Sequence, residues 1–155
     1  MGSDLKLNVN VITWNVAGID VPEDLTALFN TNSLEGVDIY TIGVQECSIW
    51  KTKDWQKHLK TLMSYYGYED VSSIDMCQMF IIVFIKTQWK PFIDNVSSSH
   101  KPMGFAKIIG NKGGVAVGFR LFGYQMTFVN CHLAPKPYKV LERNKMAKNL
   151  VKKKI

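Results

Sequence analysis

Two segments carry the residues that are best suited to chemistry. One is a lysine flanked by glycines, and the other is a strand that ends in an asparagine and a histidine. Lys112 lies between Gly110-Asn111 and Gly113-Gly114, and a later strand pattern ends at Asn130 and His132. Glycine lets backbone N–H groups approach a ligand closely, and successive N–H groups can form a concavity that binds anions. A lysine adds a point charge suited to phosphate. Together these residues predict a site for a highly phosphorylated small molecule, although the glycines alone are more typical of a plain turn.

Three apolar strand patterns end in polar residues, at Asn15, at Glu46 and at Asn130 with His132. Taken singly, Asn15 is compatible with a turn, Glu46 with a solvated loop and His132 with a core histidine. Together they indicate a ligand crevice, because strand ends commonly present side chains to a ligand. A carboxylate suits Mg²⁺, and a histidine can donate a proton or a hydrogen bond to a phosphoryl oxygen.

The surrounding patterns predict the elements that position these residues. Periodic apolar residues indicate strands and helices, and proline and serine clusters indicate loops. We expect strands over 5–16, 37–44, 79–85, 115–121 and 125–133, helices over 22–29 and 50–66, a loop over 87–105, and a basic amphipathic helix that carries Leu141, Leu150 and Val151. Hairpins mixed with helices indicate an α/β fold whose sheet is mixed or largely antiparallel.

Composition places the chain among globular proteins. It has 155 residues, 46% of them hydrophobic and 21% charged, which suits one domain with a real core. We find no secretion signal and no apolar run long enough to span a membrane. Met1-Gly2-Ser3 resembles a cloning remnant. Cys47, Cys77 and Cys131 are expected to be buried free thiols, which predicts a reducing, cytoplasmic location. A nucleophilic Cys131 is disfavoured, because adjacent strand residues point to opposite faces and separate it from His132.

The net charge of +6 belongs to one end of the chain. Residues 1–135 hold eleven basic and twelve acidic side chains, a balance of −1, whereas residues 136–155 hold eight basic and one acidic, a balance of +7. Near an anionic membrane each such cation contributes about 1 kcal/mol. A solvated helix face, or a seam to another part of the protein, explains the same run.

Four segments of the chain resemble the inositol polyphosphate 5-phosphatases, which belong to the wider endonuclease/exonuclease/phosphatase group. The matching residues are 12–18, 38–46, 110–117 and 128–134, in the family's order. The resemblance implies a four-layer α/β/β/α sandwich of the DNase I-like type. Residues 5–155 would form the N-terminal half of the catalytic domain, and residues 1–4 a remnant and the start of the first strand.

The resemblance also implies roles for single residues. It makes Glu46 and Asn15 the Mg²⁺ ligands, and Asn130 and His132 the residues that hold and polarise the scissile phosphate. The expected contacts to other phosphates are Lys86, Lys107, Asn111 and Lys112. The chain departs from the family at Met146 and Ala147, where the family has Asp-Tyr, and the family's later Gly-Asp-Leu-Asn and Asp-His segments have no counterpart.

The implied function is Mg²⁺-dependent hydrolysis of the 5-phosphate of inositol polyphosphates or phosphoinositides. The catalytic base is expected from a complementary C-terminal half, in cis or as a second chain, so this chain alone is expected to be incomplete. Two alternatives stay open: a nuclease of the same group, whose basic helix would track a nucleic-acid backbone, and a non-catalytic module that binds anionic headgroups. The Gly-Asn-Lys-Gly-Gly segment favours the phosphatase, so no nucleic-acid partner is expected. The expected location is cytoplasmic and peripheral at membranes.

Overall fold

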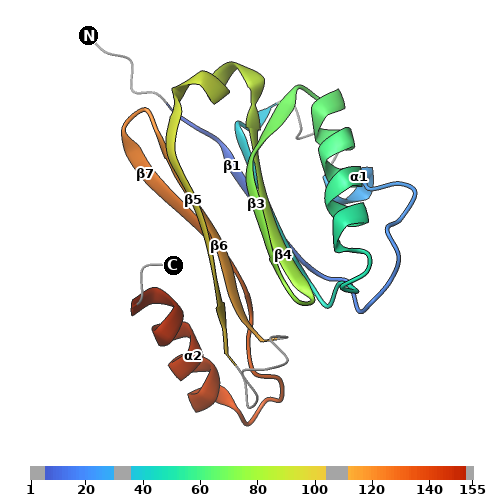
Figure 1. Ribbon diagram of the computed structural model, residues 1–155, viewed down its shortest axis with the longest axis vertical. Coiled ribbons are helices and arrows are strands. Elements are labelled where there is room, and N and C mark those ends of the chain that lie inside the picture. Colours follow the sequence, from blue (N-terminus) through green and yellow to red (C-terminus); the bar gives the residue numbers. More distant parts are fainter. Residues whose placement is uncertain (1–5, 30–35, 104–111, 153–155) are drawn as a thin grey trace.

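Two β-sheets lie face to face between two helices. The computed structural model describes residues 6–29, 36–103 and 112–152 (Figure 1). The elements, in chain order, are β1 (Val9–Asn15), η1 (Thr26–Leu28), β2 (Ile39–Gln45), α1 (Thr52–Tyr65), β3 (Tyr68–Met76), β4 (Met79–Lys86), η3 (Thr87–Phe92), β5 (Ile93–Pro102), β6 (Gly113–Leu121), β7 (Tyr124–His132) and α2 (Val140–Lys152). No helix in these described ranges is long and apolar enough to cross a membrane.

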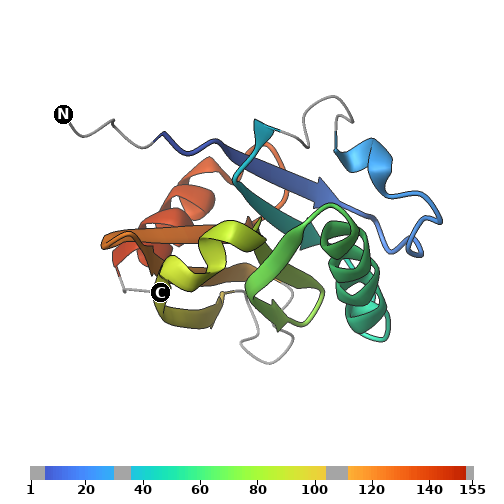
Figure 2. The same ribbon diagram turned by 90° about the horizontal axis from the view of Figure 1, so that it is seen from above.

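The sheets are mixed and mostly antiparallel, as the sequence predicts. The first has the strand order β1-β2-β4-β3, in which β1 and β2 are parallel and the other neighbours antiparallel. The second is an antiparallel meander, β5-β6-β7. Figure 2 shows α1 and α2 on opposite sides of the sheet pair. The arrangement confirms the predicted α/β/β/α layers, with α2 covering only one end of its sheet.

Two apolar layers explain why β2 and β4 are buried on both faces. Between α1 and the first sheet, Trp55, Leu59 and Met63 recur every four residues and pack on the outer face of that sheet. Between the sheets, alternate residues of β4 meet alternate residues of β6, namely Ile81, Val83 and Ile85 with Val115, Val117, Phe119 and Leu121. A strand covered by a helix on one side and a sheet on the other needs a nearly continuous apolar sequence, and β2 and β4 have one.

The glycine pair at the start of β6 serves close packing. A Cβ at Gly113, whose φ is 145°, would lie 2.1 Å from the carbonyl oxygen of Lys101. A Cβ at Gly114 would lie 2.9 Å from a methyl group of Leu150. Residues 113 and 114 therefore let β5 and α2 approach β6, which is a structural use of glycine. The preceding part of the predicted phosphate loop, with Lys107 and Asn111, lies outside the described residues.

Several expected elements are wrong. The segment 22–29 contains a short 3-10 turn at Thr26–Leu28 instead of a helix. β3 was not predicted, and β5 occupies most of the expected loop over 87–105. Both are edge strands rich in serine, and their backbone partners in β4 and β6, not their own side chains, hold them extended.

Some expected burial is also wrong. Cys47 is buried, but Cys77 and Cys131 are exposed, because one lies in the β3–β4 turn and the other points out from the edge strand β7. On α2, Leu150 is buried together with Met146, whereas Leu141 and Val151 are each 85% exposed. The buried stripe of this helix is therefore narrower than its apolar residues indicate.

Candidate active site

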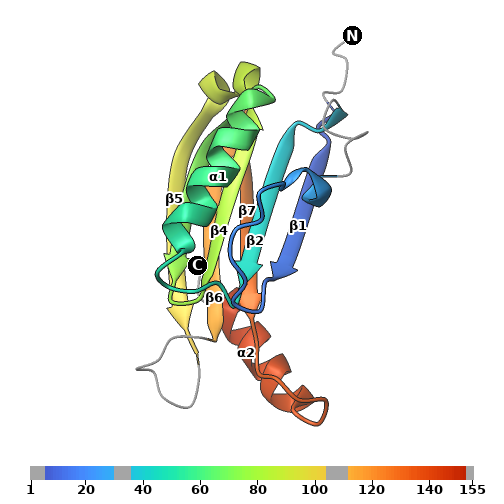
Figure 3. The ribbon, with the colours of Figure 1, turned by 90° about the vertical axis from the view of Figure 1, so that its right-hand side faces the viewer.

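Four segments bring polar side chains to one end of the sheet pair. β1 and β2 are parallel and Asn15 pairs with Gln45, so Asn15 and Glu46 leave their strands side by side. In the other sheet His132 pairs with Gly113, which places Lys112 next to His132. Because β7 packs over β2 and β4, the two groups meet at the lower end of the sheets in Figure 3.

Glu46 leaves β2 in a backbone conformation that few L-residues adopt. Its φ is 56°, and the left-handed region costs a non-glycine residue roughly 1–2 kcal/mol. Two backbone hydrogen bonds hold the turn: Gly18 N–H donates to the Glu46 carbonyl at 2.8 Å, and Val16 N–H donates to Gln45 at 2.9 Å. The turn leaves the Glu46 carboxylate 43% exposed, with Oε1 3.5 Å from His132 Nε2. Such strain gathers at functional sites.

His132 lies between a cation and a carboxylate. Lys112 Nζ lies 2.8 Å from His132 Nε2 and 3.3 Å from Nδ1. Burial lowers the pKa of His132, the Lys112 ammonium lowers it further, and Glu46 opposes both. Burial also lowers the pKa of Lys112, again opposed by Glu46. A neutral imidazole beside a half-buried ammonium can accept a hydrogen bond from it, and both side chains can donate to an anion that enters the site.

Asn130 does not reach this cluster with its side chain. It is 5% exposed, and its Nδ2 donates to the carbonyl oxygens of Val44 at 3.0 Å and Phe80 at 2.8 Å. Its Oδ1 accepts from Gln45 Nε2 at 2.5 Å. The side chain therefore ties β7 to β2 and β4, and the position predicted to hold phosphate acts in this structure as a clamp between the sheets.

Asn15 and Gln45 are the last residues of β1 and β2. Asn15 is exposed at the end of β1, and its Oδ1 accepts Ala17 N–H at 3.0 Å, an Asx turn that leaves one lone pair free. Gln45 is buried, and its Nε2 also donates to Thr13 Oγ1 at 3.0 Å. Gln45 thus links β1, β2 and β7. Its place in the Gln-Glu pair at a strand end was visible in the sequence, but its role as a positioning residue was not.

Lys86 lies at the opposite end of the molecule. It closes β4 beyond the pair Ile85–Ile39, whereas Glu46 follows the pair Gln45–Met79. At about 3.3 Å per strand residue the two ends are roughly 23 Å apart. Lys86 Nζ pairs with Asp38 Oδ1 at 3.2 Å. The structure does not bring Lys86 to the cluster of Glu46, His132 and Lys112.

The Asp38 carboxylate at that far end is a buried anchor. It accepts hydrogen bonds from Asn8 N at 2.9 Å and Trp89 Nε1 at 3.0 Å, besides the contact with Lys86. Burial raises the pKa of Asp38, but these donors outweigh burial and lower it below its ordinary value. Asp38 is therefore a structural carboxylate. Of the acids beside the matched segments, Glu46 is the one that contacts His132.

No cluster of three or more His, Cys, Asp or Glu side chains occurs within residues 6–29, 36–103 and 112–152. At this end of the sheets, the Glu46 carboxylate and the amide oxygen of Asn15 are two side-chain oxygen groups that could hold a cation. A cavity of about 290 Å³ lies further up the strands between the sheets, where it is lined by Val11 and Thr13 of β1 and by Val129 and Asn130 of β7.

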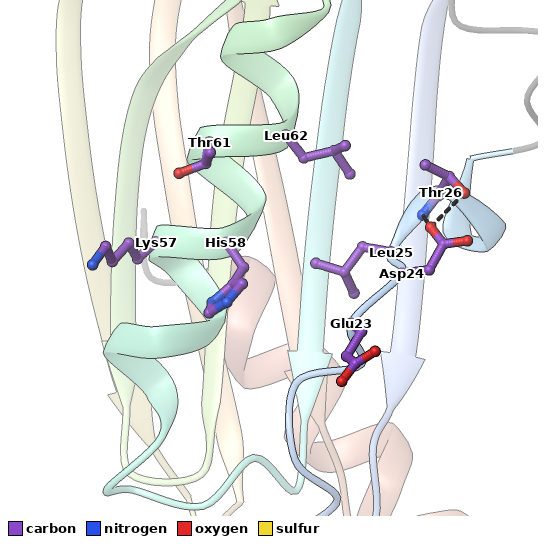
Figure 4. A pocket seen from close by; sticks show the side chains of 8 residues that line it. All are labelled: Glu23, Asp24, Leu25, Thr26, Lys57, His58, Thr61 and Leu62. Carbon is purple, nitrogen blue, oxygen red and sulfur yellow. Dashed lines mark hydrogen bonds between the residues drawn. The ribbon is translucent and has the colours of Figure 1, made fainter.

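A larger cavity, of about 510 Å³, lies elsewhere, between α1 and the segment 23–26. In Figure 4, Lys57 and His58 of α1 stand across this cavity from Glu23, and Asp24 bonds to Thr26. Neither Glu46, His132 nor Lys112 lines it. The larger cavity is therefore separate from the cluster of Glu46, His132 and Lys112.

Comparison with known proteins shows the family to which the chain belongs. Residues 12–155 match the family described as endonuclease/exonuclease/phosphatase family 2. Inositol polyphosphate 5-phosphatase K of Mus musculus is 35% identical over 85% of this chain and 30% of its own length. Phosphatidylinositol 4,5-bisphosphate 5-phosphatase A of Homo sapiens is 30% identical over 84% of this chain and 14% of its own length. The chain thus spans less than a third of these curated relatives.

Solved structures show the same fold. The inositol polyphosphate 5-phosphatase domain of SPsynaptojanin, in complex with inositol (1,4)-bisphosphate and a calcium ion, superposes with a TM-score of 0.81 and 25% identity, over 92% of this chain and 44% of that one. A Cimex nitrophorin superposes with a TM-score of 0.69 and 20% identity, over 84% of this chain and 48% of that one. The fold thus serves more than one chemistry, and function depends on the side chains at the site.

Proposed function

Because the chain belongs to the endonuclease/exonuclease/phosphatase family, we propose that it forms part of a phosphomonoesterase site for the 5-phosphate of inositol polyphosphates or phosphoinositides. One observation carries the proposal: Lys112 Nζ lies 2.8 Å and Glu46 Oε1 lies 3.5 Å from the same His132 nitrogen. A cation, a neutral imidazole and an exposed carboxylate at one strand end provide for phosphate binding, proton transfer and metal binding in a single cluster.

Lys112 and His132 are the phosphate-binding pair. The Lys112 ammonium is half-buried, so its attraction for a phosphate is less screened than that of a fully exposed lysine. With its lowered pKa, His132 is neutral at neutral pH and donates one ring N–H. It is placed to support charge on a phosphoryl or leaving oxygen, a contribution of typically about 10²–10⁴ in rate. Asn130 acts behind this pair, because it fixes the strand that presents His132.

The donors also fit Mg²⁺. Glu46 makes no ion pair with a lysine or arginine within the described ranges, and Asn15 Oδ1 keeps one lone pair. Mg²⁺ takes oxygen ligands, typically one or two protein carboxylates, and keeps waters that phosphate oxygens can replace. We assign Glu46 and Asn15 as its ligands; the ion would neutralise charge on the phosphoryl oxygens. The related synaptojanin domain held a divalent cation, calcium, together with an inositol bisphosphate.

The base that activates the attacking water is assigned to the part of the domain that the relatives have beyond the matched region. β1 and β7 each have a sheet neighbour on one side only, among the described strands. Val11 on β1 and Val129 on β7 are 63% and 45% exposed, and the 290 Å³ cavity lies between them. These edges form a docking surface for the complementary half, in cis or as a second chain, beside Glu46 and His132.

The test compares Glu46→Gln with the wild type, in the full gene product or in this chain reconstituted with the complementary half. Glutamine keeps the shape and removes the charge, so we expect Mg²⁺-dependent phosphate release to be abolished and the circular dichroism spectrum to be unchanged. Glu23→Gln, an exposed carboxylate away from the cluster, is the matched control and should retain turnover. Near-normal turnover of Glu46→Gln would sink the metal assignment. Equal release from inositol phosphates with and without a 5-phosphate would sink the substrate assignment.

A nuclease is the second candidate, because the matched family includes endonucleases and the segment 136–155 is basic. The cluster of Lys112, His132 and Glu46 suits either phosphoester. Plasmid nicking with Mg²⁺ separates the two: nicking that exceeds inositol phosphate hydrolysis would favour the nuclease.

A further inference from the structure

The outward face of α2 combines lysines with a large apolar side chain. Leu141, Lys145, Lys148 and Lys152 follow one another at intervals of four, three and four residues, which places them on one side of the helix. All four are exposed, and Leu141 is 85% exposed. Met146 and Leu150 lie on the other side and are buried, and Leu150 packs against Gly114 of β6. We call these four exposed residues the outward face of α2.

The helix is fixed to the second sheet at both ends. The Arg143 guanidinium donates to the carbonyl oxygens of Ala134, Lys136 and Pro137, which ties the loop after β7 onto the first turns of α2. Near the other end, Lys101 Nζ donates to the Asn149 carbonyl oxygen. The outward face is therefore held in one orientation relative to β7 and to His132 at its end.

The charge of this face is not neutralised within the described residues. Glu142 is the one acid of the segment 136–152, and it pairs with Lys139 at 3.0 Å. The Arg143 guanidinium donates its hydrogen bonds to backbone carbonyl oxygens. Lys145, Lys148 and Lys152 make no ion pair with any residue in the described ranges.

The apolar residues favour lipid over solvent and nucleic acid as the partner, and a seam to another part of the protein would prevent binding in the test below. A solvated face carries polar side chains, and a nucleic-acid backbone is contacted mainly by charged and polar ones. Leu141 lies on this face with the lysines; Tyr138 shortly before α2 and Val151 near the end of α2 are 79% and 85% exposed. A basic face interleaved with exposed apolar residues is typical of helices that lie in a membrane interface.

The position of α2 connects this face with the candidate active site. β7 ends at His132, and the segment 133–139 leads directly into α2, which begins at the same end of the sheets as the cluster of Glu46, His132 and Lys112 (Figures 1 and 3). A surface bound to the outward face would therefore lie on the outer side of the second sheet, near the end of the sheets that carries this cluster (Figures 1 and 3).

We propose that the outward face of α2 docks on an anionic lipid bilayer. Lys145, Lys148 and Lys152 supply the attraction to anionic lipids, and Leu141 enters the headgroup region. The docking stands on α2 alone and is independent of the proposed function.

The test is sedimentation of the full gene product, or of this chain reconstituted with the complementary half, with phosphatidylcholine vesicles that contain phosphatidylserine and no phosphoinositide. The triple variant Lys145→Gln, Lys148→Gln, Lys152→Gln removes three cations, each worth about fivefold in partitioning, so it should bind on the order of 100-fold more weakly. Leu141→Ala keeps a good helix former and should weaken binding about tenfold by removing buried methyl groups. The matched control is Lys6→Gln, Lys53→Gln, Lys57→Gln, which changes the net charge equally away from α2 and should bind like the wild type after correction for net charge.

The vesicles carry no substrate, so their result is independent of turnover at Glu46. Circular dichroism checks that each variant is folded, and high salt should weaken wild-type binding. Equal binding by the α2 triple variant and the control would overturn the proposal, as would unchanged binding of Leu141→Ala or no binding of the wild type. Tight binding of duplex DNA through the same lysines, without vesicle binding, would overturn it in favour of a nucleic-acid surface. If vesicle binding fails while Glu46→Gln still abolishes turnover, only the membrane proposal falls.

Discussion

Asn130 offers the sharpest test of the structure, because the sequence predicted a phosphate ligand at this position and the structure shows a clamp between the sheets. Asn130→Ala removes three buried hydrogen bonds, to Val44, Phe80 and Gln45. At about 1 kcal/mol for each bond, the free energy of unfolding should fall by roughly 3 kcal/mol. Urea unfolding followed by tryptophan fluorescence measures this loss.

A second substitution tests the geometry of the clamp. A Cβ at Gly43 would lie 2.7 Å from Asn130 Cγ and 2.9 Å from both Oδ1 and Cβ, so Gly43→Ala should cost about 1–3 kcal/mol by overpacking. In the Asn130→Ala background two of these three atoms are gone. The cost of Gly43→Ala should then shrink by about 1 kcal/mol, a coupling that a double-mutant cycle resolves.

The control is Asn10→Ala on β1, whose side chain makes no hydrogen bond with the described residues. It should change the free energy of unfolding by no more than about 0.5 kcal/mol. The reasoning would be refuted if Asn130→Ala behaved like this control, or if the cycle with Gly43→Ala showed no coupling. Loss of inositol phosphate binding by Asn130→Ala at unchanged stability would restore its predicted role as a phosphate ligand.

Three further outcomes are expected. Lys112→Met should weaken binding of inositol (1,4)-bisphosphate, measured by calorimetry, by roughly tenfold or more, whereas Lys86→Met should leave it unchanged; similar losses in both would contradict the placement of Lys86 at the far end. The NMR titration midpoint of His132 should lie below the ordinary histidine value of 6.5, should rise in Lys112→Met and should fall in Glu46→Gln. An unshifted or raised midpoint in the wild type would argue against the buried neutral imidazole. Because the folded-state pKa of Asp38 is lowered, its stabilisation should be present above the unfolded value of 3.8 and lost as the pH falls through the folded value. Urea titrations should therefore show the wild type more stable than Asp38→Asn at neutral pH, and this difference in the free energy of unfolding should disappear in acid. A difference that persists in acid would contradict the assignment.

The apolar runs determined the centre of the fold directly from the sequence. Val37–Val44 and Met79–Ile85 are nearly continuous in apolar residues, and only a strand covered on both faces uses such a run, so β2 and β4 were predictable. The four-residue spacing of Trp55, Leu59 and Met63 fixed α1 in the same way. Local periodicity is sufficient where one element carries its own buried face.

Only the tertiary structure decided two features: the conformation of the polar edge strands, and the partners of the polar residues at the site. The serines of β3 and β5 carry no strong strand preference, and hydrogen bonding to β4 and β6 decides their conformation. At the site, the sequence placed Glu46 and His132 at strand ends, but only the stacking of β7 over β2 brings these two side chains within 3.5 Å of each other. Asn130 lies two residues before His132 on the same strand. The Asn130 side chain is bound to the carbonyls of the facing sheet, whereas His132, the last residue of the strand, contacts Lys112 and Glu46.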